Sequence, residues 1–138
     1  MQITNTDPYR AVREELAALR HQVAGVTGCI VAGVDGLLIL HDTLSSAEPH
    51  DVAAMAAAAN GISRTCGTAL RQGAFREVTI RNHGGYLAIY AVGDLALLAV
   101  IGDNGLNIAR LHLEARPVTE RLIKLLEAPY LQNGHPFD

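Results

Sequence analysis

Apolar residues recur along the chain at two spacings, and each change of spacing marks a new element. The first pattern begins at Thr6-Asp7-Pro8, where we expect Asp7 to cap a helix and Pro8 to occupy its first position. Apolar residues then recur every three or four positions, which predicts an amphipathic helix that ends at Gly25 and Gly28. The apolar positions of this helix are Tyr9, Val12, Leu16, Leu19 and Val23.

Five apolar runs of strand length follow the first helix. Asp35-Gly36 separates the first two runs, and Gly84-Gly85 and Gly93-Asp94 separate the last three. Asp-Gly between apolar runs is a strong hairpin signal, and such short turns make neighbouring strands antiparallel. The five runs are residues 29–32, 37–40, 75–82, 86–92 and 95–101.

The strand-like runs differ in how much of their surface is apolar. Residues 86–92 and 95–101 are apolar on both faces, so helices must cover both sides of the sheet. In residues 75–82, Val78 and Ile80 alternate with polar side chains. This alternation is typical of an edge strand or of a strand with one face exposed.

Two longer helical segments complete the pattern. Residues 49–70 are rich in alanine, and a last helix starts near Asn107, with Pro117 on its solvent side, where it kinks the helix without ending it. The order α-β-β-α-β-β-β-α predicts an α/β chain that forms an α+β sandwich around one antiparallel sheet. Residues 1–128 form a single domain in this prediction, and residues 129–138 a loosely ordered C-terminal tail.

The middle helix lacks the charged outer face that a solvent-exposed helix normally carries. No charged residue lies between Asp51 and Arg64. The larger apolar residues fall on one stripe, which we expect to pack on the sheet, and small residues fall opposite, which predicts a protein–protein interface there. The predicted sheet-facing stripe is Val52, Met55, Ala59, Ile62, Cys66 and Leu70, and the small-residue face is Ala53, Ala54, Ala57, Gly61, Thr65 and Thr68, with Asn60 and Arg64 among them.

Charge and cysteine usage narrow the functional class. The net charge is −3, and no block of like charges occurs, so neither the basic face of a nucleic-acid binder nor the basic amphipathic helix of a membrane-surface protein is present. No apolar stretch approaches the length of a membrane span, and Arg10, Arg13 and Glu14 interrupt any N-terminal signal pattern. Cys29 and Cys66 have no metal-ligand spacing. These features favour a soluble cytoplasmic protein with both thiols free.

Candidate catalytic and metal-binding motifs have simpler explanations. His83-Gly84-Gly85 has the glycines of an esterase oxyanion hole, but the chain has no G-x-S-x-G motif, so a hairpin turn is favoured. His41-Asp42 and His50-Asp51 flank a loop without fixed ligand spacing, and capping by Asp51 is favoured over a metal site. No G-x-x-x-x-G-K-[ST] motif is present, so the chain is not itself a P-loop nucleotide hydrolase. The sequence therefore predicts no enzyme, no metal and no cofactor.

The order of the elements and several local sequences resemble the roadblock/dynein light chain family, over residues 9–126. The residues that carry this resemblance are Val26-x-Gly28, Asp35-Gly36-Leu37-Leu38, the alanine-rich residues 53–62, Gly85-Tyr86-Leu87, Val92-Gly93-Asp94 and Leu97-x-Ala99-Val100.

The resemblance implies a five-stranded antiparallel sheet in the order 2-1-5-4-3. It places the long middle helix on one face and the first and last helices on the other. It also implies a homodimer formed through the middle helix and third strand, and a role as a non-enzymatic regulator or scaffold of a small Ras-like GTPase in a bacterium. The predicted dimer-interface residues are Ala54, Ala57, Gly61, Arg64, Thr65, Thr68, Val78 and Ile80.

A small-molecule sensory module is the alternative, because sheet-plus-helix domains of this size can hold a ligand in the core. Such a cavity needs a few polar groups that converge on apolar walls, and the strand interiors offer almost none. The sequence therefore favours the GTPase-binding dimer.

Overall fold

The computed structural model describes residues 7–132 of the 138-residue chain. Three helices and five strands follow one another in the predicted order, and none of the helices in this part of the chain is long and apolar enough to cross a membrane. The elements are α1 (Pro8–Gln22), β1 (Val26–Gly33), β2 (Leu38–Thr43), α2 (Pro49–Ala69), β3 (Glu77–Asn82), β4 (Gly85–Val92), β5 (Ala96–Asp103) and α3 (Ile108–Gln132).

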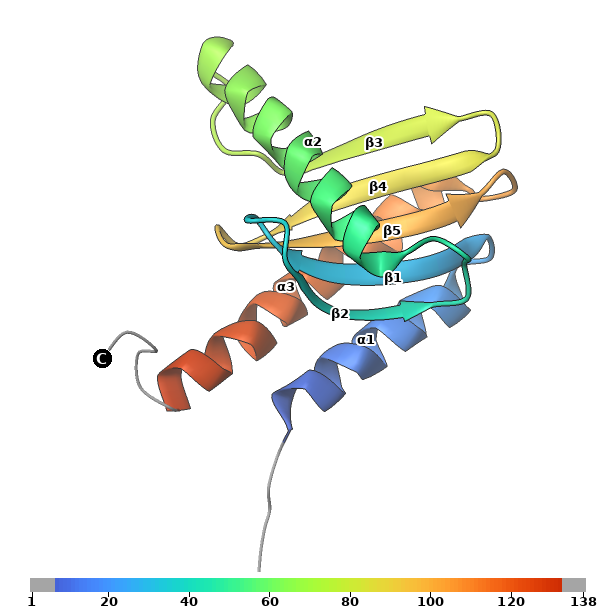
Figure 1. Cartoon of the computed structure of the whole chain (residues 1–138), viewed down its shortest axis with the longest axis horizontal. Helices are drawn as coiled ribbons and strands as arrows, with labels where there is room; N and C mark the ends of the chain where they lie inside the picture. The colour runs from blue at the N-terminus through green and yellow to red at the C-terminus, as the bar shows by residue number, and fades with distance from the viewer. Residues whose placement is uncertain (1–6, 133–138) are drawn as a thin grey trace, which may run out of the picture.

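The five strands form one antiparallel sheet in the order β2-β1-β5-β4-β3, which confirms the predicted order. Figure 1 shows α2 crossing one face of this sheet, while α1 and α3 lie side by side on the other. The strands β2 and β3 are therefore the two edges, and β3 lies at the edge that the C-terminal half of α2 approaches.

The helix α1 begins and packs as its spacing predicts. The carboxylate of Asp7 accepts a hydrogen bond from the backbone N–H of Tyr9 at 2.9 Å. Val12, Leu16 and Leu19 are fully buried. The apolar stripe therefore faces the sheet and α3, and its first residue, Tyr9, is the exposed one at 40%.

Two apolar cores of different size lie on the two faces of the sheet. The core under α1 and α3 holds large side chains, including Leu16, Leu19, Tyr90, Leu111 and Leu122. The core under α2 is smaller, and its fully covered members are Ile30, Val52, Ala56, Ile89, Leu97 and Ala99.

The last helix is longer than the sequence predicts. It runs without interruption from Ile108 to Gln132, past Pro117, whose side chain is exposed as expected. The predicted tail starts at Pro129, yet the backbone stays helical to Gln132. The rest of the predicted tail, residues 133–138, lies outside the described residues.

Candidate functional site

The helix α2 starts one turn before the residue that the sequence predicts as its cap. The capping prediction for Asp51 is wrong, because the Glu48 carboxylate accepts from the backbone N–H of His50 at 3.0 Å and Pro49 takes the first helical position. Asp51 lies in the first turn instead, where its charge interacts favourably with the positive end of the helix dipole.

The face that α2 turns to the sheet is not the one that its apolar spacing predicts. Val52 is buried as expected, but Met55 is 51% exposed, Ile62 is 69% exposed and Leu70 is 63% exposed. Cys66 is exposed as well. The prediction of a sheet-facing stripe is therefore wrong for these four residues. The residues of α2 that are buried are Val52, Ala53, Ala56, Asn60 and Gly67. The prediction of an outer position is therefore wrong for Ala53 and Asn60.

Small side chains explain this orientation. Ala53, predicted on the outer face, and Ala56 are completely buried, and such small residues let a helix lie close to the surface beneath it. Further along, Gly67 passes so close to the loop after α2 that a Cβ atom there would lie 2.3 Å from the carbonyl oxygen of Gly73. Larger residues on this stripe would push the helix away, so the bulky ones occupy the outer side.

The eight predicted interface residues fall into two groups. Ala57 lies against the β1–β2 turn, because its Cβ atom is 3.6 Å from the position that a Cβ on Gly36 would take. Gly36 itself has a φ of +90°, which the turn requires and glycine adopts without strain. Arg64 and Thr68 line a groove beside the β4–β5 turn. Ala54, Gly61, Arg64, Thr65, Thr68 and Ile80 are exposed, whereas Ala57 and Val78 are half-buried.

Three large apolar side chains of α2 and one of the edge strand β3 remain exposed. We refer to Met55, Ile62 and Leu70 of α2 together with Ile80 of β3 as the outer apolar face. Ile80 is 38% exposed, and it lies on the same side of the sheet as Val78, which packs against the core under α2. A monomeric protein rarely leaves such a set of apolar side chains in water, and an apolar helix face without charges marks an interaction surface.

The edge strand β3 adds hydrogen-bonding groups to this surface. It pairs with β4 alone, with Val78 opposite Ile89 and Ile80 opposite Leu87. The N–H and C=O groups on its other side have no strand partner within residues 7–132, and such an edge can pair with another chain.

The sequence did not identify the outer residues of α2, because either of two stripes on this helix could face the sheet. One stripe is bulky and apolar, and the other is small. Periodicity alone selects the bulky stripe. The signal for the correct choice is the series at positions 53, 56, 60, 63 and 67, where no side chain is larger than asparagine.

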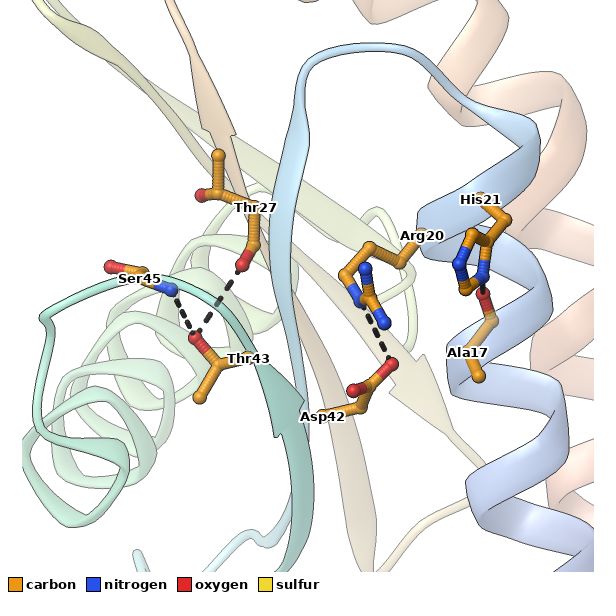
Figure 2. A network of polar contacts seen from close by, with 7 residues as sticks. All are labelled: Ala17, Arg20, His21, Thr27, Asp42, Thr43 and Ser45. Atoms are coloured by element: carbon orange, nitrogen blue, oxygen red, sulfur yellow. Dashed lines mark hydrogen bonds and ion pairs between the residues drawn. The ribbon is translucent and has the colours of Figure 1, made fainter.

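The polar residues near the β2 edge make structural contacts (Figure 2). The Arg20 side chain of α1 donates to the Asp42 carboxylate of β2 at 3.0 Å. Thr43 Oγ1 accepts from the backbone N–H of Ser45 at 3.0 Å and donates to the Thr27 carbonyl at 3.5 Å. Asp42 is thus engaged by an arginine, and residues 7–132 contain no group of three or more His, Cys, Asp or Glu side chains placed to hold a metal ion.

The predicted turn at residues 83 and 84 is confirmed, and one of the two cysteines is buried. Residues 83 and 84 join β3 to β4, and both are exposed. Cys29 is buried in β1, and burial, with a smaller contribution from Asp42, raises the pKa of its thiol to about 12. A thiol with this pKa is protonated at neutral pH and is not a nucleophile.

A polar network ties the start of β3 to α3. The guanidinium group of Arg116 donates to both Glu77 carboxylate oxygens, at 3.0 and 2.9 Å, and this pairing lowers the pKa of Glu77 although partial burial opposes the shift. Tyr90 and His112 are joined by a 2.7 Å hydrogen bond beside the same carboxylate. Burial, with a smaller effect from Glu77, raises the pKa of Tyr90. The network anchors the otherwise poorly covered edge strand.

Comparisons with known proteins agree with this geometry. The sequence pattern of the Roadblock/LC7 domain matches residues 12–102. A Roadblock/LC7 domain from Streptomyces avermitilis superposes with a TM-score of 0.74 at 22% identity, over 86% of this chain and 96% of that chain.

Two solved structures of MglB are also similar. The gliding protein MglB from Thermus thermophilus gives a TM-score of 0.80 at 18% identity, over 91% of this chain and 96% of that chain. Myxococcus xanthus MglB gives 0.80 at 16% identity, over 88% and 99%. At such low identities, the TM-scores show that the fold is shared and no more. No curated protein matches the sequence significantly.

The family match covers about two-thirds of the chain, and the strand order, the helix placement and the structural neighbours agree with it. The chain belongs to the Roadblock/LC7 domain family.

Proposed function

We propose that this protein is a cytoplasmic, non-enzymatic homodimer that regulates or scaffolds a small Ras-like GTPase through protein–protein contacts. The observation that carries the proposal is the outer apolar face, with Ile62 at 69% and Leu70 at 63% exposure on a helix without charges between Asp51 and Arg64. A second copy of the chain is the occupant we propose for this face.

The free energy available from burying the exposed side chains of α2 shows whether this helix alone can hold a dimer together. Burying each half- to two-thirds-exposed side chain among Met55, Ile62 and Leu70 contributes about 1–2 kcal/mol. Two-fold symmetry doubles the set, so the helix contacts supply about 6–12 kcal/mol, against an association cost of about 4–15 kcal/mol. Helix contacts alone are therefore marginal, and the second contribution that we propose is β3.

The edge strand supplies what the helix lacks. Antiparallel pairing of β3 with its symmetry mate satisfies its free N–H and C=O groups and continues the sheet across the dimer. Ile80 then lies near the dimer axis, together with the C-terminal half of α2. In this arrangement Val78 and Ile80 keep the interface role that the sequence suggests, while Met55, Ile62 and Leu70 replace Ala54 and Ala57 as the main apolar contacts of α2.

The GTPase role rests on membership of the family and on the absence of a phosphate-binding loop in the chain. A chain without G-x-x-x-x-G-K-[ST] is not itself a P-loop nucleotide switch, and the partner role that we propose rests on its family. Discrimination between nucleotide states requires contact with a switch segment that the γ-phosphate orders and hydrolysis releases. The extent of this discrimination between the GDP and GTP states equals the difference in the binding free energy for the two states.

Titration calorimetry tests this role. The dimer is titrated with the Ras-like GTPase encoded nearest to its gene, loaded with GDP or with a non-hydrolysable GTP analogue, and an unrelated Ras-like GTPase serves as the control. We expect binding to the neighbouring GTPase with unequal affinities for its two states. Equal affinities would reduce the protein to a passive scaffold, and no binding to either state would remove the GTPase role.

A further inference from the structure

A groove of about 570 Å³ opens at the end of the sheet where α2 passes over the turns between strands. The β1–β2 turn, the β4–β5 turn and the loop from α2 to β3 all lie at this end (Figure 1). The volume falls within the roughly 300–1,000 Å³ of small-molecule sites. Side chains from all of these segments line it, which makes it a feature of the folded domain.

One residue that lines the groove is a buried amide without a hydrogen-bond partner in the described part of the chain. Asn60 is 5% exposed, and its side chain makes no hydrogen bond within residues 7–132, although it lines the groove. Thr119, the other buried polar residue in this part of the chain, donates to the Arg116 carbonyl at 2.7 Å. A buried amide without a partner destabilises the folded state, and a ligand group that bonds to it from the groove removes that cost.

Two arginines line the same groove. Arg64 and Arg71 make no ion pair within the described residues, whereas several other arginines of the chain are paired. Asp94 of the β4–β5 turn is the carboxylate in the lining. The lining therefore carries one net positive charge, which suits a singly charged anion better than a polyphosphate.

The backbone keeps Arg71 at the mouth of the groove despite an unfavourable conformation. Its φ is +55°, a left-handed value that glycine adopts more easily. The N–H of Arg71 bonds to the Thr68 carbonyl at 3.2 Å, and the N–H of Gln72 bonds to the Gly67 carbonyl at 2.7 Å, which is the pattern of a Schellman helix end. An arginine therefore stands where a glycine would fit the turn better.

We propose that this groove binds a small organic monocarboxylate that also carries an amide. The carboxylate is held by Arg64 and Arg71, and the amide bonds to Asn60. The apolar part of the ligand lies against Phe75 and Leu97, both of which line the groove. The site goes beyond the proposed GTPase role, and its occupancy is measured without a second protein.

Hippurate is a suitable probe because it combines a carboxylate, an amide and a phenyl ring. The full chain, labelled with ¹⁵N, is titrated with hippurate, with its neutral methyl ester and with inorganic phosphate, and amide shifts are followed by NMR. We expect saturable shifts centred on residues 60–75 and 91–97 with hippurate. The ester should bind at least about tenfold more weakly, since it lacks the charge that the guanidinium groups recognise.

Three substitutions separate ligand binding from folding. Asn60→Leu removes the amide but fills the same space with apolar atoms, so hippurate binding should fall at least about tenfold while the urea midpoint stays equal or rises. Arg71→Gly suits the left-handed turn and removes one guanidinium group, so binding should weaken in a folded protein. Arg76→Gln changes an exposed arginine that does not line the groove and is the matched control.

Several outcomes contradict the proposal. Equal affinity for hippurate and its ester, or shifts centred on other residues, means that the arginines do not recognise a carboxylate. A loss of stability in Asn60→Leu with unchanged binding shows that Asn60 has a structural role only. Phosphate binding that matches or exceeds hippurate binding reduces the groove to an unspecific anion site, and no shifts at millimolar hippurate exclude this ligand class.

Discussion

The two faces of the sheet are covered by helices that use their side chains in opposite ways. On the α1 and α3 side, most bulky residues of each helix point inward, and Leu16, Leu19 and Leu111 are completely buried. On the α2 side, small residues point inward, and Met55 and Ile62 remain in water. The first face is complete within one chain. On the α2 face, small residues let the helix lie close to the sheet, and the exposed side of the helix keeps apolar surface that a partner can cover.

This difference shows what an apolar stripe does and does not establish. Periodicity identifies the side of a helix that avoids water, whether its own sheet or another molecule covers it. For α1 and α3, the side that avoids water is the side that packs on the sheet, because the other side of each helix is charged. For α2 every side is uncharged over three turns, so burial in the domain and burial in an assembly leave the same pattern.

The two thiols give the largest contrast between the faces. Cys29 is buried in β1 with a pKa raised to about 12, whereas Cys66 is exposed on α2. At a dilution at which the chain is monomeric, a thiol reagent at pH 8 should modify Cys66 at least about a thousandfold faster, because Cys29 reacts only when the domain opens. Mass spectrometry under native conditions and in urea checks this. Similar rates for both thiols in the native protein would contradict the assigned faces.

Truncation of one buried leucine tests the complete face. Leu111→Ala should lower the free energy of unfolding by about 2–5 kcal/mol, because it removes a buried side chain of α3 and leaves a cavity. Urea denaturation at one fixed protein concentration measures the change. The matched control is Leu113→Ala, two residues along the same helix and 69% exposed, which should change stability by less than about 0.5 kcal/mol.

The contribution of the Glu77–Arg116 pair to stability should depend on pH. The folded-state pKa of Glu77 is lowered, chiefly by the hydrogen bonds from Arg116, so its contribution is present above its unfolded pKa and lost as pH falls through the folded value. Glu77→Gln should therefore lower the urea midpoint at pH 6–7, and its difference from the wild type should shrink below about pH 4. A difference that is constant with pH would show that this carboxylate has no electrostatic role.

The smallest effect concerns a glycine on the outside of α2. A Cβ atom at Gly61 meets nothing within 4 Å, so Gly61→Ala should raise the stability of the subunit by about 0.5–1 kcal/mol through helix propensity. Thermal unfolding at a protein concentration low enough to dissociate the dimer measures this change in subunit stability. If the substitution also weakens self-association, then a partner helix approaches closely at this residue; a less stable subunit would contradict the exposed placement.

Much of the fold could be predicted from local chemistry. Turn residues such as Asp35-Gly36 fix the hairpins, and the alternation of Val78 and Ile80 with polar residues marks an edge strand. The cap of α2 was missed because glutamate is a less common N-cap than aspartate, and Glu48 bonds where Asp51 was expected.

The candidate site was harder to predict, because its residues act through tertiary placement. Arg64 and Thr68 were predicted as interface residues from their position on a helical wheel, and the structure shows in addition that both line a groove. Asn60 was predicted on the outer face of α2, but it belongs to the small-residue stripe that the helix buries, and it also lines the groove.

Sedimentation equilibrium of the wild type and of one matched pair of variants tests the central claim most directly. Ile62 on α2 and Leu113 on α3 are both 69% exposed, so Ile62→Glu and Leu113→Glu make the same change on the two opposite faces of the molecule. We expect the wild type and Leu113→Glu to sediment as dimers of the 14.7 kDa chain at micromolar concentration, and folded Ile62→Glu to sediment as a monomer. A monomeric wild type, or an Ile62→Glu variant that dimerises as tightly as Leu113→Glu, would contradict the claim that the outer face of α2 is the dimer interface.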